Sequence, residues 1–151
     1  MSNGIKVLFG AVLGLLYVVF GLLQFVQAVF EAVSGVPMAG LAALLVPGNV
    51  FSGFVLIVVG AVLLTGAKKL SGGAEEGMPF IYVGILLSVG FGLVALCSMG
   101  AGALEAAAFP EEGAEPWSVV DTITPILYLA VIGVLGFLAW GKELFRGIRA
   151  A

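Results

Sequence analysis

The sequence contains no histidine and only one cysteine, Cys97, among its 151 residues. An intramolecular disulfide is therefore impossible, and a metal site built from several cysteines or histidines is excluded. The same absences exclude haem ligation by histidine and nucleophilic catalysis that depends on a histidine base. We accordingly expect no metal site, no cofactor and no enzymatic activity.

Charged side chains are also scarce, at 10% of the residues, whereas 62% are hydrophobic and the mean hydropathy is +1.23. Soluble domains have about 25% charged and about 45–50% apolar residues. A chain of this length cannot bury so much apolar surface in a water-soluble fold. Lipid must therefore surround most of the chain, and we expect a single transmembrane domain over residues 1–151.

Four apolar runs are long enough to cross a bilayer, which takes about 20 residues of helix. They cover approximately residues 5–30, 50–67, 79–101 and 119–140. Beyond the first few residues of a run, none of them contains a charged side chain. The sequence therefore predicts an all-α membrane protein, a bundle of four transmembrane helices.

The basic residues indicate how such a bundle is oriented. With four spans, all six fall on one side, namely Lys6, Lys68, Lys69, Lys142, Arg146 and Arg149. The other side holds only acidic residues: Glu31, Glu105, Glu111, Glu112, Glu115 and Asp121. Because lysine and arginine favour the cytoplasmic side, we expect both termini there, in a multi-pass protein of the cell membrane.

A further apolar segment, residues 38–46 (MAGLAALLV), is too short to span a bilayer. It either lies at the interface or dips into the membrane as a re-entrant segment. The interpretation that we favour is a short helix packed on the outer ends of the spans.

Glycine is abundant, with 23 residues, most of them inside the spans. Small residues let membrane helices approach one another closely. The candidates for such packing are Gly10, Gly14, Gly21, Gly84, Gly92 and Gly133. Two interpretations stay open: the glycines pack the four helices on one another, or they form docking faces for partner subunits.

Polar side chains share one face of the first span. Tyr17, Gln24, Gln27 and Glu31 follow one another at helical spacings of seven, three and four residues. Polar groups at membrane depth usually face protein or a water path. One hypothesis is therefore a polar entry from outside, in which Glu31, or Glu105 at the end of the third span, handles protons or cations. In the alternative, which we favour, both carboxylates lie among the headgroups and the glutamines bond across helices.

Three segments carry a resemblance to a known family. They are YVVFG at 17–21, PGNVFSGF at 47–54 and TPILYLAV at 124–131. Their order resembles the MrpB/MnhB family, small four-span subunits of multisubunit cation/proton antiporters with relatives in membrane-bound hydrogenase modules. In that family a Y-x-x-F-x-G-like helix end leads into P-G-G-G-F-x-G-G. The matching positions are Pro47, Gly48, Phe51 and Gly53, whereas Asn49, Val50 and Phe54 depart from the pattern.

The resemblance implies an accessory integral-membrane subunit of a larger ion-translocating complex. Pro47 and Gly48 would then shape a helix start that lines or supports an ion route. We expect lipid and other membrane subunits as partners, and no nucleic acid. Two alternatives remain: a stand-alone homo-oligomeric transporter or channel with an outer acidic entry, and a membrane enzyme, for which the spans offer no charged cluster.

Overall fold

The computed structural model describes residues 3–113 and 115–150, and all regular structure in this part of the chain is helical. The helices are α1 (Asn3–Ser34), α2 (Ala39–Ala42), α3 (Val50–Ser71), α4 (Gly77–Ala108), α5 (Val119–Thr122) and α6 (Pro125–Ala150). The all-α fold expected from composition and hydropathy is therefore confirmed.

Four of these helices, α1, α3, α4 and α6, are long and apolar enough to cross a membrane. The helices α1 and α4 have 32 residues each. At 1.5 Å per residue such a helix is about 48 Å long, against about 30 Å of hydrocarbon. Both must therefore be tilted or extend past the hydrocarbon, which explains why they are longer than the apolar runs that predicted them.

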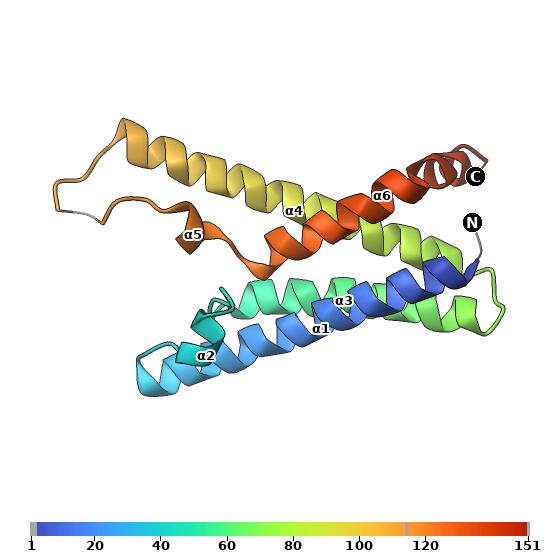
Figure 1. Ribbon diagram of the computed structural model, residues 1–151, viewed down its shortest axis with the longest axis horizontal. Coiled ribbons are helices and arrows are strands. Elements are labelled where there is room, and N and C mark those ends of the chain that lie inside the picture. The colour runs from blue at the N-terminus through green and yellow to red at the C-terminus, as the bar shows by residue number, and fades with distance from the viewer. Residues whose placement is uncertain (1–2, 114, 151) are drawn as a thin grey trace.

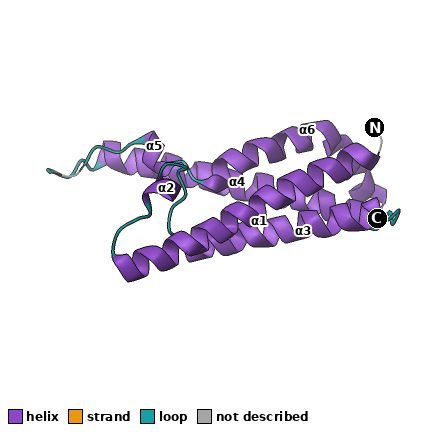
Figure 2. Cartoon of the chain, turned by 60° about the horizontal axis from the view of Figure 1, so that its bottom comes forward, coloured by secondary structure: helices purple, strands orange, loops and turns teal. Residues whose placement is uncertain are grey.

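The two ends of the bundle differ (Figure 1). The start of α1, the α3–α4 connection and the last turns of α6 lie together, and we call this the terminal end. The opposite end carries α2 and α5, and we call it the loop end. In both views α1 and α3 run side by side, while α4 diverges from them toward the loop end (Figures 1 and 2). The terminal end is therefore closed and the loop end splayed.

Pairs of glycines hold α1 against α3. A Cβ atom at Gly60 would lie 2.7 Å from the carbonyl oxygen of Gly14, and one at Gly21 would lie 2.8 Å from that of Gly53. The two contacts are one heptad apart on both helices, as expected for antiparallel neighbours. Backbone therefore meets backbone at two levels, which is the way small residues join membrane helices.

The other glycines predicted to pack also face neighbouring helices. Gly10 lies in ordinary contact with Ile81, and Gly84 lies so close to Leu63 that a Cβ would come within 2.5 Å of it. Gly92 and Gly133 face Ala130 and Ser88 between α4 and α6. By contrast, nothing lies within 4 Å of a Cβ placed at Gly90 or Gly100 of α4.

The fourth span begins later than predicted. Residues 119–122 form the separate helix α5, and α6 begins at Pro125. Between them Ile123 is extended, with ψ 124°, and Thr124, the residue before Pro125, is not helical. Proline disfavours the helical conformation in the residue before it, but its fixed φ suits the first position of a helix. The predicted start at 119 is thus wrong because Pro125 separates the two helices.

The segment at 38–46 contains only the four-residue helix α2. The backbone N–H of Met38 donates to Gln27 Oε1 of α1, and the side chains of Leu41 and Val46 are buried. The chain therefore folds back along one side of the last turns of α1, at Gln27. This arrangement agrees with a short helix packed on the ends of the spans.

Candidate functional site

Most of the buried polar side chains in the described residues belong to one face of α1. Lys6, Gln24 and Gln27 are each no more than 3% exposed, and Ser88 of α4 is the other buried polar residue. Tyr17, on the same face, is 2% exposed. These groups form three levels along the bundle: one near the loop end, one in the middle and one at the terminal end.

At the loop end, Gln27 connects α1 to the segment that folds back on it. Its Nε2 donates to Glu31 Oε1 at 2.9 Å, and its Oε1 accepts the Met38 N–H at 3.3 Å. Gly48 lies against the same carboxylate, because a Cβ there would be 2.5 Å from Glu31 Oε2. The polar face of α1 and the Pro47–Gly48 pair therefore meet at Glu31. The sequence singled out these two features for separate reasons.

A pocket of about 230 Å³ opens beside Glu31. Gln27, Glu31 and Pro47 line one side of it, and Asp121 and Thr124 line the other. Both charges around the pocket are negative, so it favours cations over anions. Sequence spacing could not associate Asp121 with Glu31, because only the fold brings α5 to α1.

Glu105 does not belong to this pocket. It is exposed near the end of α4 and lines a separate cavity of about 660 Å³ with Glu111, Glu115 and Trp117. The four candidates for an ion path therefore divide into Gln24, Gln27 and Glu31 on α1, and Glu105 on its own.

Gln24 lies one helical turn deeper than Gln27 and is completely buried. Neither its Nε2 nor its Oε1 has a hydrogen-bond partner among the described residues. A buried amide without partners costs several kcal/mol in an apolar environment. The space for this side chain comes from Gly53 of α3, where a Cβ would lie 3.2 Å from the Gln24 Cβ.

Replacement of the two glutamines by leucine should have opposite effects on stability. Gln24→Leu removes an unpaired buried amide and is expected to stabilise the fold by about 1–2 kcal/mol. Gln27→Leu removes two hydrogen bonds and is expected to destabilise it by a similar amount. Thermal unfolding in detergent measures the stability of both variants. A loss of stability in Gln24→Leu would indicate that the amide has a hydrogen-bond partner in the folded protein.

In the middle of the bundle, the hydroxyl of Tyr17 and that of Ser88 share a hydrogen bond, and both side chains are buried. Gly133 of α6 lies directly against Ser88, which leaves no room for a larger residue. This pair joins α1 to α4 at the level where α6 crosses.

Between the middle level and the terminal end the core is apolar. On α1 the buried positions from Tyr17 back to Lys6 are only Gly14, Leu13 and Gly10. Ile81 and Ile85 of α4 are buried opposite them. The polar face of α1 is therefore interrupted here.

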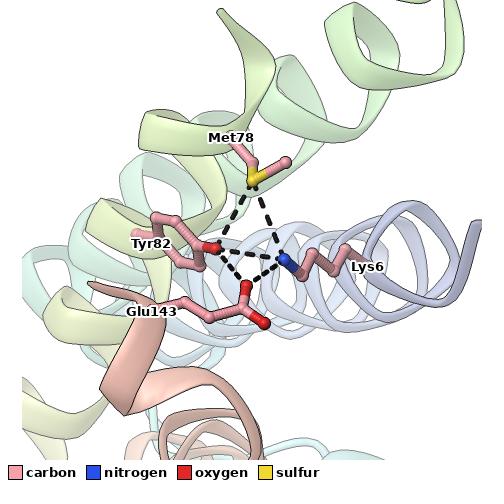
Figure 3. A network of polar contacts seen from close by, with 4 residues as sticks. All are labelled: Lys6, Met78, Tyr82 and Glu143. Carbon is pink, nitrogen blue, oxygen red and sulfur yellow. Dashed lines mark hydrogen bonds and ion pairs between the residues drawn. The ribbon is translucent and has the colours of Figure 1, made fainter. Parts of the chain in front are cut away.

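At the terminal end, Lys6 is at the centre of a polar cluster made by three helices (Figure 3). Its Nζ is paired with the Glu143 carboxylate of α6 and donates to the Tyr82 hydroxyl of α4 at 3.1 Å. The Tyr82 hydroxyl in turn donates to Glu143 at 2.9 Å, and Met78 Sδ lies 3.7 Å from Nζ. Sequence reasoning used Lys6 only as a signal of orientation. Lys6 lies within the first residues of an apolar run, and this position is the one signal in the sequence that it needs an acidic partner.

The predicted helix-start motif begins α3. Asn49 accepts the N–H of Ser52 at 2.9 Å, which caps the helix. Gly53 lies on Gly21, whereas Phe51 is 75% exposed and does not line the Glu31 pocket. Of the four motif residues, Pro47 lines the pocket, Gly48 lies against the Glu31 carboxylate, and Gly53 contributes to helix packing.

Comparison with known proteins identifies a family. A family model described as MJ0565 integral membrane domain matches residues 1–142, a range that includes all three polar levels except Glu143 of the terminal-end cluster. No curated protein and no solved structure matches the chain.

Proposed function

Because the chain belongs to the MJ0565 integral membrane domain family, and is thus a multi-pass membrane protein, we propose that it is an accessory subunit of a larger ion-translocating complex. The specific form that we propose is a cation/proton antiporter-like module, with no enzymatic role for this chain. The resemblance of Pro47, Gly48, Phe51 and Gly53 to the MrpB/MnhB helix start supports this form.

The observation that carries the proposal is the interrupted polar face of α1. Polar groups reach inward from Glu31 through Gln27 and Gln24 to the Tyr17–Ser88 pair. Below this level, Leu13, Ile81 and Ile85 fill the core. The pocket beside Glu31 reaches Gln27, and buried polar side chains of α1 continue to the level of Tyr17, whereas none follows across the next turns. Such a bundle can admit or position an ion but needs a neighbouring subunit to complete a route.

The charge distribution supports an orientation with the loop end outside the cell. The six basic residues belong to the terminal end, and the loop end carries Glu31, Asp121 and the carboxylates of the α4–α5 connection. Since basic residues favour the cytoplasmic side, both termini would be cytoplasmic. The Glu31 pocket would then face the outside of the cell.

The test is purification of the affinity-tagged full-length chain from its own membranes in a mild detergent. We expect it to co-purify with larger multi-span subunits, and we expect Glu31→Gln in the assembled complex to lower cation/proton exchange in proteoliposomes. The chain purified alone should give no exchange. A chain that is isolated only as a monomer would contradict the proposal.

The alternative of a stand-alone homo-oligomeric transporter is distinguished by the same experiment. It predicts Glu31-dependent flux from proteoliposomes that contain this chain only. Glu105→Gln is the matched control, because this carboxylate is also near the loop end but lines a different cavity.

A further inference from the structure

The last turns of α6 carry a row of basic side chains. Lys142, Arg146 and Arg149 follow one another at spacings of four and three residues, so they share one face of the helix. All three are exposed. Over seven residues the row extends about 10 Å along the helix axis.

This row continues a stripe of apolar side chains on the same face of α6. Val131, Leu135 and Leu138 are 62%, 60% and 74% exposed, and their spacings of four, three and then four lead directly to Lys142. In a membrane-spanning helix, such an exposed apolar stripe faces the acyl chains of lipid. The face therefore changes from apolar to basic where acyl chains give way to headgroups.

The only acidic residue of α6 does not neutralise this row. Glu143 is paired with Lys6 in the terminal-end cluster (Figure 3), and among the described residues it forms no ion pair with the basic row, although Arg146 is only three residues away. The terminal-end cluster thus uses the one carboxylate that α6 carries. Among the described residues, the basic row therefore has no ion pair with a carboxylate of its own helix.

We propose that Lys142, Arg146 and Arg149 bind the headgroup of an anionic phospholipid whose acyl chains lie along the stripe from Val131 to Leu138. Guanidinium groups bind phosphate oxygens through two parallel hydrogen bonds, and lysine adds a point charge. The apolar stripe fixes the depth of the lipid, and the basic row selects for headgroups of net negative charge.

The experiment compares spin-labelled phosphatidylglycerol with spin-labelled phosphatidylcholine, using the full-length chain in phosphatidylcholine vesicles. Electron paramagnetic resonance measures the fraction of each lipid that the protein immobilises. Each basic residue near an anionic headgroup contributes roughly a fivefold preference at most. We expect wild type to prefer phosphatidylglycerol several-fold, and K142Q/R146Q/R149Q to bind both lipids equally.

The matched control is K68Q/K69Q, which removes two basic residues at the same end of the bundle but from α3. It should keep most of the preference. The proposal is overturned if wild type shows no preference, if the α6 triple variant retains it, or if the α3 variant loses as much. The helical content and melting temperature of each variant are measured as well, and unchanged values exclude a folding defect.

Discussion

Gly21→Val is expected to destabilise the bundle by about 3 kcal/mol or to prevent its assembly, because the new side chain has no space. A Cβ at this position would lie 2.8 Å from the carbonyl oxygen of Gly53 and 2.7 Å from Ile57 Cγ1. The first of these atoms is backbone and cannot rotate away. The helices α1 and α3 must therefore separate, and the Gly14–Gly60 contact one heptad away opens with them.

Separation of α1 from α3 would also disturb the candidate site, since Gln24 lies beside Gly53. The measurement is the free energy of unfolding in mixed micelles, followed by helical circular dichroism during titration with SDS. Gly100→Val is the matched control, because the same substitution there meets nothing within 4 Å. If the two substitutions lower the free energy of unfolding equally, the loss of stability comes from helix propensity rather than from the α1–α3 contact.

The helices could be predicted from the sequence because membrane spans depend on local composition. Uncharged apolar runs are sufficient to locate four of them, and the error at residue 119 arose from following hydropathy past Pro125. A single proline interrupts a helix, but it lowers the mean hydropathy of a long apolar run too little to mark the interruption. The position of Pro125, rather than hydropathy alone, therefore determines where the fourth span begins.

The candidate site could be predicted only where its residues share one helix. The spacing of Gln24, Gln27 and Glu31 places them on one face, because the period of a helix is fixed. Asp121 and Glu143 come to the polar groups of α1 through helix packing, which no local pattern encodes. Sequence reasoning therefore found one of the two carboxylates of the loop-end pocket, Glu31, and missed the cluster at the terminal end.

The terminal-end cluster makes an asymmetric prediction about its two charged partners. The Lys6 side chain is 4% exposed, whereas that of Glu143 is 47% exposed. Glu143→Gln leaves a buried ammonium without a counter-charge and is expected to cost about 3 kcal/mol of stability. Lys6→Met leaves a carboxylate that water can reach and that keeps the Tyr82 hydroxyl, so the expected cost is about 1 kcal/mol or less.

The double variant Lys6→Met/Glu143→Gln should be nearly as stable as Lys6→Met, because it contains no unpaired buried charge. The measurement is a double-mutant cycle, which needs the free energies of unfolding of the wild type, both single variants and the double variant. It gives the coupling free energy between Lys6 and Glu143. Glu76→Gln is the control: its contact with Lys69 is 3.9 Å long, its side chain is 85% exposed, and we expect no measurable change. If Lys6→Met proved the more damaging single substitution, the lysine would contribute mainly through its packing among Met78 and Tyr82 rather than as a buried charge that requires Glu143.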